Sequence, residues 1–468
     1  MVAISPQFAY GELPVLQRPT GLLVTLAMLA GAVYLAAIWM LKLPLPGPRA
    51  RATADAARPG RGWWLWVLGV GLGMRALMIP STPMLETDYF RYLWDGAVVA
   101  HGHNPYAHAP EAVLNGEAPV ELVELGEASG LVLERVNHPW LTTIYPPTAQ
   151  AGFALAHTAS PWRIEGLRLV WFLFDLVTLG LLIGLLRQLA LPLSALLIYW
   201  WNPLLIREGY NTAHMEMTLL PFVVAALWLA VRHRLLASGI ALAMAVGAKL
   251  WPVLLLPTLL RQCGGRWNRI GTAAGVFALL GALIVSPMLL THFGETAGLR
   301  AYAGTWQIND TLYQGFYLLG RWIAPEDAHR AARLMVAFVL LGWIAWLCRR
   351  PAHNGRAVCE RALWIVACLF LLSPTQLPWY WLWLLPMLVV RPSPGLLVLT
   401  ATLPLYYLRF PMRELGYSAW FNHGVVWLQF APAFLLLAWE AWRRTSRLEQ
   451  TLAADPRHMH GKQAGVRS

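Results

Sequence analysis

The chain has 468 residues, of which 57% are hydrophobic and only 13% are charged. Soluble domains carry roughly 25% charged residues, so this composition excludes an ordinary soluble protein. The net charge of +12 comes largely from basic residues in short loops, which indicates membrane topology, and no nucleic-acid partner is predicted. Apolar runs of about 17–25 residues, long enough to cross a bilayer as helices, recur along the chain and predict an all-α polytopic membrane protein.

The first apolar run, Leu22–Leu41, precedes a segment from Lys42 to Arg61 that holds five basic residues against one acid. Because short basic loops stay in the cytoplasm, we expect the N-terminus outside and the next helix, Gly62–Pro80, to run outward. Residues 1–61 are therefore predicted to be an extra N-terminal helix with its cytoplasmic loop. Three glycines in the second helix are expected to permit close helix packing: Gly69, Gly71 and Gly73.

Residues 81–165 are predicted to form a large external loop. Between Pro83 and Val136 this interval carries nine acidic residues and only two arginines. Its last apolar piece, Thr148–Ala159, is too short to span a bilayer and is expected to be an interfacial or re-entrant helix.

Further spans are predicted at Gly166–Leu186, Pro192–Ile206, Met217–Val231, Leu236–Ala248, Leu250–Leu260, Ile270–Leu290, Arg330–Leu347, Arg361–Leu372, Tyr380–Val390, Gly395–Leu408 and Val425–Ala441. With the first two they make about 13 transmembrane helices. The two short helices around Lys249 are expected to form a broken pair. We divide the remainder into a core of transmembrane helices (62–290) that includes the external loop, C-terminal helices (291–442) and a flexible cytoplasmic tail (443–468).

Three scarce carboxylates fall within one stretch at the start of the external loop: Glu86, Asp88 and Asp95. Charges at a membrane surface are costly, so they indicate a functional site. If the stretch is helical, Asp88 and Asp95 lie about 10 Å apart along the axis, too far to share one reacting atom. Arg91 and Asp95 are spaced as an i, i+4 ion pair, which favours a structural role for Asp95.

Polar groups also gather in later turns that are predicted to be external. The residues concerned are Arg207, His214, Glu216, Lys249, Trp306, Gln307, Asp310, Gln376, Trp379, Tyr380, Arg409 and Arg413. Their common side of the membrane predicts one shared site that faces outward.

These residues resemble the GT-C glycosyltransferases, polytopic enzymes that use polyprenyl-phosphate sugars. Glu86-Thr87-Asp88 matches the acidic pair of their first external loop. The closer resemblance is to bacterial polyprenol-phosphate-mannose-dependent mannosyltransferases. It is carried by Asp88-x-x-Arg91-Tyr92-x-Trp94-Asp95-Gly96, Gly102-x-Asn104-Pro105-Tyr106, Tyr145-Pro146-Pro147, Trp201-Asn202-Pro203-Leu204, Lys249-x-x-Pro252 and Pro378-Trp379-Tyr380. One departure is His214-Met215-Glu216, where the family pattern would have His-x-Asp.

The resemblance implies a bacterial inner-membrane enzyme with its catalytic core in 62–290 and its active site on the periplasmic side. It also implies that Asp88 is the general base of an inverting transfer. The transfer moves a hexose, most plausibly mannose, from a polyprenyl phosphate to a hydroxyl of a lipid, glycan or protein. Three roles stay open for Glu86: it assists the base, holds a metal or caps a helix. The prediction of a divalent metal at Glu86 and Asp88 is also left open, and no other cofactor is predicted. The departing phosphate needs cations, for which the candidates are Lys249, Arg207 and Arg409. Candidate substrate-binding residues are Arg91, Asp95, Tyr145, His214, Glu216, Gln376, Trp379 and Tyr380.

Structural explanations compete with several of these assignments. Lys249 could snorkel to the interface, Arg207 could pair with Glu208, and Arg409 could be a solvated loop charge. At the level of function, the alternatives are a transporter or flippase of lipid-linked sugars, and an enzyme like an O-antigen ligase or polymerase.

Overall fold

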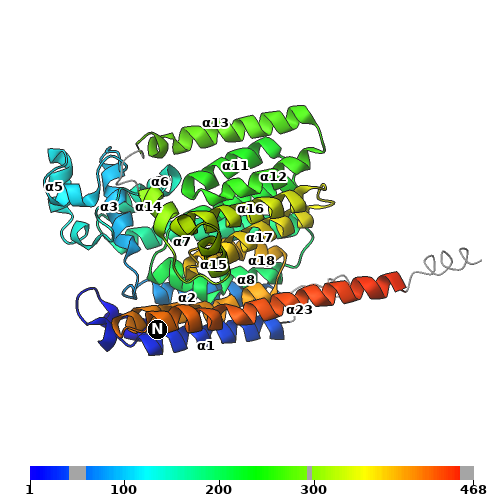
Figure 1. Ribbon diagram of the computed structural model, residues 1–468, viewed down its shortest axis with the longest axis horizontal. Helices are drawn as coiled ribbons and strands as arrows, with labels where there is room; N and C mark the ends of the chain where they lie inside the picture. Colours follow the sequence, from blue (N-terminus) through cyan, green and yellow to red (C-terminus); the bar gives the residue numbers. More distant parts are fainter. Residues whose placement is uncertain (42–59, 292–297, 454–468) are drawn as a thin grey trace, which may run out of the picture.

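The computed structural model describes residues 1–41, 60–291 and 298–453. Within these ranges the fold is helical, without any strand and with one isolated parallel bridge between Ile308 and Thr375 (Figure 1). The prediction of an all-α membrane protein is confirmed, but the number of about 13 spans is not. Five described helical segments are long and apolar enough to cross a membrane: α1 (Thr20–Met40), α7 (Ile164–Gln188), α13 (Trp267–Thr291), Pro325–Cys348 with α16 (Ala328–Cys348), and Ser418–Ser446 with most of α23 (Val426–Ala453).

Other predicted spans are present as shorter continuous helices: α2 (Arg61–Met78), α10 (Glu216–Val231), α11 (Leu235–Ala248) and α17 (Gly355–Leu372). Four predicted spans are instead broken into short pieces. These pieces are η5 (Leu193–Leu196), α8 (Leu197–Trp200) and α9 (Pro203–Ile206); η7 (Trp251–Leu255) and α12 (Leu256–Leu260); η10 (Pro378–Trp383) and α18 (Leu385–Val390); α19 (Pro394–Leu397), α20 (Leu399–Thr402) and η11 (Leu403–Leu408). Proline causes many of these breaks, because it cannot donate a backbone hydrogen bond and favours the first turn of a new helix.

The predicted external loop folds into four α-helices and one short 3-10 helix at one end of the bundle: α3 (Asp88–Ala100), α4 (Pro110–Leu114), α5 (Val120–Ala128), η4 (Leu133–Arg135) and α6 (Pro147–Ala159). Helix α3 packs closely on α6. A Cβ at Gly96 would lie 2.4 Å from the carbonyl oxygen of Phe153, so this crossing requires glycine. The ring of Tyr92 stacks on Phe153 with 4.7 Å between centroids. This packing places the first residue of α3, Asp88, beside the ends of the long helices.

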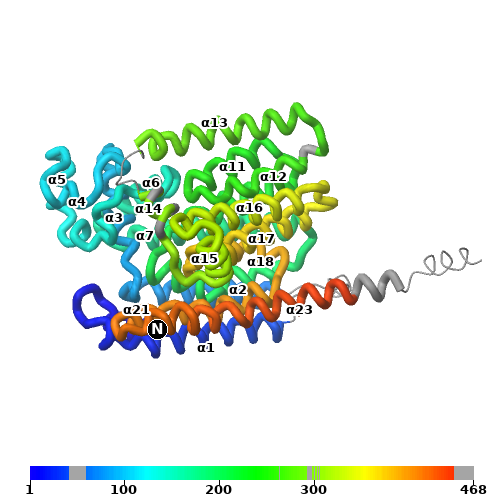
Figure 2. Tube along the Cα trace, in the orientation of Figure 1, coloured from blue at the N-terminus to red at the C-terminus, as the bar shows by residue number. Residues whose placement is uncertain are grey.

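In Figure 1 and Figure 2, α13 runs along one edge of the molecule and α1 and α23 along the other. Helix α10 packs between α7 and α11, and α11 packs on α13; α1 and α23 both contact α20 and η11. Short helices α14 (Gly298–Thr305), α15 (Leu312–Ile323), α21 (Arg409–Glu414) and α22 (Ser418–Trp420) complete the fold. Helix α23 runs on to Ala453, beyond the predicted end at Ala441. The basic loop at 42–59 and the tail from 454 lie outside the described residues.

A buried ion pair joins α2 to α7. Arg75 Nε lies 2.6 Å from Asp175 Oδ2, and both side chains are inaccessible to solvent. The hydroxyls of Tyr199 and Tyr210 donate to the same carboxylate at 2.7 and 2.6 Å. Because an unpaired charge inside the bundle would be expensive, this network fixes how α2 sits on its neighbours.

One of the three glycines of α2 makes a close helix contact. A Cβ at Gly71 would lie 2.0 Å from the indole nitrogen of Trp200, whereas a Cβ at Gly69 or Gly73 would meet nothing within 4 Å. The predicted role in packing therefore belongs to Gly71 alone.

We expect Gly71→Ala to destabilise the protein, because the added methyl forces Trp200 or α2 to move, at a cost of about 1–3 kcal/mol. The measurement is the thermal unfolding midpoint of the purified protein in detergent. Gly69→Ala is the matched control and should leave the midpoint unchanged or raise it, since alanine favours the helix. Equal midpoints for the two variants would contradict the Gly71 contact.

Candidate active site

A cavity of about 690 Å³ opens at the end of the bundle that carries α3. Its lining residues come mainly from the start of α3, the segment before α6, the end of α11 at Lys249, α14, η10 and α21. Nine of the predicted site residues line it: Glu86, Asp88, Arg91, Tyr145, Glu216, Lys249, Trp379, Tyr380 and Arg409. The other four lie outside this lining: Asp95, Arg207, His214 and Gln376.

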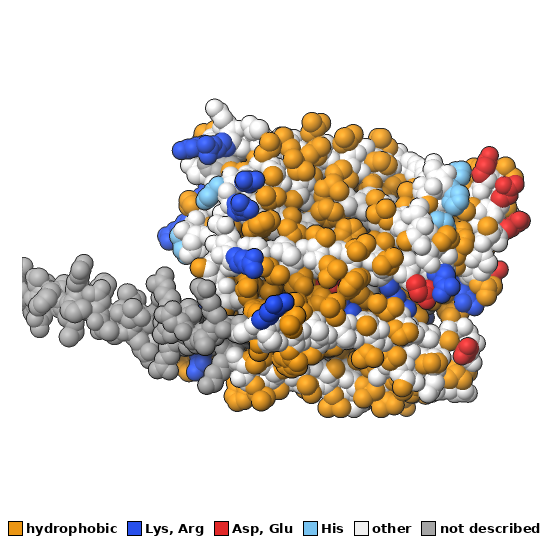
Figure 3. Space-filling view, turned by 180° about the vertical axis from the view of Figure 1, so that it is seen from behind, with side chains coloured by type: hydrophobic (Ala, Val, Ile, Leu, Met, Phe, Trp, Pro, Cys, Tyr) orange, Lys and Arg blue, Asp and Glu red, His pale blue; other side chains and the backbone are white. Residues whose placement is uncertain are grey.

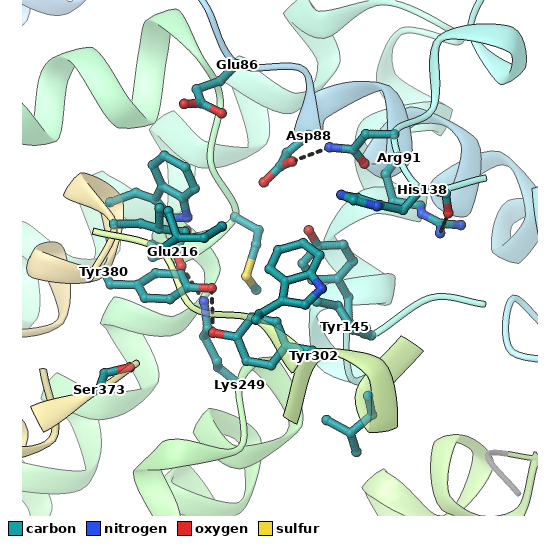
Figure 4. Close-up of a pocket in the computed structure, with 18 of the residues that line it drawn as sticks. Glu86, Asp88, Arg91, His138, Tyr145, Glu216, Lys249, Tyr302, Ser373 and Tyr380 are labelled. Carbon is teal, nitrogen blue, oxygen red and sulfur yellow. Dashed lines mark hydrogen bonds and ion pairs between the residues drawn. The ribbon is translucent and has the colours of Figure 1, made fainter. Parts of the chain in front are cut away.

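Asp88 is the first residue of α3, and its side chain remains 22% exposed to the cavity (Figure 4). Asn137 Nδ2 donates a hydrogen bond to Asp88 Oδ1 at 2.7 Å. Burial raises the pKa of Asp88, while the Asn137 hydrogen bond and the charges of Lys249 and Arg91 lower it. A carboxylate with a raised pKa binds a proton more strongly, which suits a general base.

Glu86 lies two residues before Asp88 on the same wall, and its Oε1 has no hydrogen-bond partner among the described residues. Burial, together with the negative charges of Asp88 and Glu208, raises the pKa of Glu86 well above its usual range. Two like charges this close are unfavourable, so Glu86 is the carboxyl that is expected to keep its proton.

Arg91 and Asp95 hold a loop against α3. Arg91 Nη1 lies 4.0 Å from Asp95 Oδ1, the predicted i, i+4 pair, and Arg91 Nη2 donates to the carbonyl of Leu141 at 2.6 Å. Gln150 Nε2 donates to Asp95 Oδ2 at 3.1 Å, which ties the same pair to α6. Asp95 is buried behind Arg91, so its contacts are those of a structural residue.

Lys249 ends α11 with an extended backbone, at the break that was predicted between two short helices. Its Nζ lies 2.5 Å from Glu216 Oε1 and 4.0 Å from the ring centroid of Tyr380 (Figure 4). A hydrogen bond of 3.0 Å joins the hydroxyls of Tyr380 and Tyr302. Lys249 therefore presents a cation to the cavity, but one whose charge is already partly balanced by Glu216.

A second polar cluster lies beneath the cavity. The pair of Arg207 and Glu208, the structural alternative to phosphate binding by Arg207, is present and fully buried, within a π-helical turn at Arg207–Asn211. Tyr407 donates to Glu208 at 2.9 Å. The buried His214 ring stacks on Trp379, with 3.8 Å between centroids, and its Nδ1 lies 3.9 Å from Asp88 Oδ2. Through His214, this buried cluster contacts two residues of the cavity lining, Asp88 and Trp379.

Two arginines of α21 line the cavity without a carboxylate partner. Among the described residues no ion pair includes Arg409 or Arg413. Arg409 contacts the hydroxyl of Tyr406 at 3.5 Å. These two guanidinium groups are therefore the cations most available to an anionic ligand.

Residues 5–263 match the family model described as "Alpha-(1->6)-mannopyranosyltransferase, N-terminal domain". The chain belongs to this family. It is also similar to Alpha-(1->6)-mannopyranosyltransferase A of Mycobacterium tuberculosis (strain ATCC 25618 / H37Rv), with 27% identity over 422 residues, which cover 81% of this chain and 75% of that protein. No solved structure gives a significant match. The resemblance to GT-C mannosyltransferases is thus confirmed, and the protein is a membrane mannosyltransferase.

The family match covers only part of this mannosyltransferase site. It includes the acidic stretch and Lys249, whereas η10 and α21 lie beyond residue 263. Gln376, also beyond it, is buried and uses its amide for the fold: Nε2 donates to the carbonyl of Leu371 at 2.8 Å, and Oε1 accepts from Thr311 at 3.3 Å.

Sequence reasoning missed Asn137 as a partner of this mannosyltransferase's acidic stretch. It lies 49 residues after Asp88 and belongs to none of the recognised motifs. The weak signal that could have found it is its position shortly before the Tyr145-Pro146-Pro147 motif, in the same acidic interval.

A divalent metal remains a prediction for this mannosyltransferase. The described residues contain no group of three or more His, Cys, Asp or Glu side chains that could hold a metal ion. If an ion such as Mg²⁺ bound at Glu86 and Asp88, Glu86 would have to give up its proton, and the ion would keep several waters and take its remaining ligands from a substrate phosphate. In that case the ion would help to neutralise the phosphate.

Proposed function

We propose that this protein transfers mannose from a polyprenyl phosphate to a hydroxyl of a glycan acceptor, by direct displacement with Asp88 as the base. The observation that carries the proposal is one cavity that combines Asp88 with the cations Lys249, Arg409 and Arg413, in a member of a mannosyltransferase family. The mycobacterial relative is an alpha-(1->6)-mannopyranosyltransferase, and we propose the same linkage here.

In this reaction the acceptor oxygen attacks the anomeric carbon and forms the new glycosidic bond. The hydroxyl proton passes to the Asp88 carboxylate, and the bond between the anomeric carbon and the phosphate oxygen breaks. Polyprenyl phosphate leaves with the bonding electrons, and the cations stabilise its charge. Direct displacement inverts the anomeric centre, so a β-linked donor yields an α-linked product.

We infer that the cavity faces the periplasm. Figure 3 shows Asp and Glu side chains gathered at one end of the molecule, beside a few Lys and Arg side chains, whereas Lys and Arg predominate at the other end. Positive charge is retained on the cytoplasmic side of bacterial inner-membrane proteins. The acidic end, which carries α4, α5 and the cavity, would therefore be external, with the N-terminus outside and the C-terminus in the cytoplasm.

Asp88→Asn should reduce transfer by about 10²–10⁴-fold, because the amide cannot accept the acceptor's proton. The measurement uses purified protein in liposomes with labelled polyprenyl-phosphate mannose and a mannooligosaccharide acceptor. The matched control is Glu111→Gln, an exposed acid of the same external segment, which should keep wild-type activity. Full activity of Asp88→Asn would exclude Asp88 as the base. Labelled lipid that crosses the bilayer without any transfer would favour a flippase instead.

Asn137→Ala should move the acid limb of the pH–rate profile to higher pH. The Asn137 hydrogen bond lowers the pKa of Asp88, so its loss raises that pKa, and more alkaline conditions are needed to ionise the base. The measurement is kcat/KM as a function of pH. Asn115→Ala, an exposed asparagine outside the cavity, is the control and should leave the limb in place. An unshifted limb in Asn137→Ala would mean that another group limits the rate at low pH.

Arg409→Ala should raise the KM for the lipid donor by roughly 10-fold or more, the effect of losing a hydrogen bond to a charged group. Arg409→Lys should recover only part of this loss, because an ammonium lacks the bidentate fork. Arg321→Ala, an exposed arginine of α15, serves as the control. If the donor KM is the same in Arg409→Ala as in the control, the phosphate binds elsewhere in the cavity.

A further inference from the structure

The walls of the cavity differ in charge. The cations Lys249, Arg409 and Arg413 suit the phosphate of the donor. The wall formed by Asn137, His138, Trp306 and Gln307 offers neutral amides and aromatic rings instead. In Figure 4, His138 lies on the other side of Asp88 from Glu216 and Tyr380. This aromatic wall has no role in the donor chemistry described above.

The two rings of the aromatic wall contact each other, and Trp140 lies beside them. The His138 ring lies 5.0 Å from that of Trp306 and 5.2 Å from that of Trp140, measured between centroids. Trp306 in turn contacts Tyr302 at 5.3 Å. His138 and Trp306 line the cavity itself, and Trp140 beside them is 51% exposed. The wall therefore leads from solvent to the interior of the cavity.

The wall is held in a fixed shape by contacts from elsewhere in the fold. His138 has a φ of +49°, a left-handed conformation that is uncommon for a residue with a side chain. Arg91 secures this turn by donating to the carbonyl of Leu141 at 2.6 Å. On the other side, Arg333 Nη2 donates to the carbonyl of Trp306 at 3.1 Å. Such strain persists only where the surroundings enforce it, and it is concentrated at binding sites.

The aromatic wall also adjoins the base. Asn137, the neighbour of His138 in the chain, donates to Asp88 at 2.7 Å. A ligand that rests on His138 and Trp306 therefore lies next to the carboxylate that must receive the acceptor's proton.

The chemistry of the wall suits a neutral sugar. A hexopyranose has an apolar face of C–H bonds that packs on aromatic rings. Gln307 Nε2 already donates to Asp310 and Gln314, so a hydroxyl at the edge of the sugar would donate to Gln307 Oε1. Burial and the nearby Arg91 lower the pKa of His138, so its ring is uncharged at neutral pH. A phosphate would find no positive charge on the side chains of His138, Trp306 and Gln307.

We propose that His138 and Trp306, with Gln307, form the acceptor subsite, which holds the terminal hexose of a neutral oligosaccharide with its attacking hydroxyl toward Asp88. This inference rests on the proposed function and adds the place of the acceptor to it. Trp306 supplies the stacking surface, and His138 closes the subsite beside the base.

The test compares Trp306→Ala with Trp306→Tyr, which keeps an aromatic face, and with Trp322→Ala, an 82% exposed tryptophan of α15 that serves as the control. His138→Asn removes the ring while keeping a residue that tolerates the left-handed conformation. Trp306→Ala and His138→Asn should each raise the KM for a short α-(1→6)-linked mannooligosaccharide at least 10-fold. The donor KM, and the slow transfer of mannose to water, should stay at wild-type values. Trp306→Tyr should recover most of the acceptor affinity.

An unchanged acceptor KM in both variants, or a rise in the donor KM instead, would overturn the subsite. Saturation-transfer NMR of the mannooligosaccharide on the detergent-solubilised protein gives a second readout that needs no turnover. Loss of that signal in Trp306→Ala but not in Trp322→Ala supports the subsite. Equal signals reject it. A wild-type protein that binds the oligosaccharide but transfers mannose neither to it nor to water would reject the proposed function and leave the subsite standing.

Discussion

A charged side chain inside an apolar helical bundle is stable only when it has a partner, and this constraint shapes the whole molecule. Three ion pairs with at least one fully buried member cross between elements or close a turn: Arg75 with Asp175, Arg207 with Glu208, and Lys249 with Glu216. The buried Arg168 is held by backbone carbonyls instead. In the cavity the matching is incomplete. Asp88 has an amide as its nearest hydrogen-bond donor, and Arg409 and Arg413 have no carboxylate partner among the described residues. A ligand with a phosphate for Arg409 and Arg413 and a hydroxyl for Asp88 would supply the missing partners.

The helices of the bundle are broken at the positions where charged side chains have to reach their partners. Helix α11 ends at Ala248 so that Lys249 can reach Glu216, and the chain resumes in η7. The π-turn at Arg207–Asn211 brings Glu208 toward Tyr407, and η10 carries Trp379 to the cavity. Within a membrane, broken helices are tolerated only where protein or a cavity satisfies the freed backbone groups. The broken helices thus form the site, while the long helices provide its frame.

Local patterns in the sequence predicted local contacts well. The Arg91–Asp95 pair, the Arg207–Glu208 pair and the break at Lys249 all involve residues close in the chain, where helical geometry and composition decide the outcome. The same reasoning could not tell which side chains face the cavity. His214 and Gln376 stand in polar turns as expected, yet the fold buries both behind the lining. The continuous helices predicted over Tyr380–Val390 and Gly395–Leu408 were wrong, because hydropathy alone does not register the backbone donors that Pro386 and Pro404 lack.

The sequence by itself determined the class of protein, the positions of its long helices and the family to which its motifs belong. These properties follow from composition, from runs of apolar residues and from short motifs, all of which are encoded locally. Only the tertiary structure decided that Asn137 supports Asp88, that Arg413 joins Arg409 on the cavity wall, and that the rings of His138 and Trp306 meet. These contacts join segments far apart in the chain, and their geometry depends on the packing of α3 on α6 and of the segments around them.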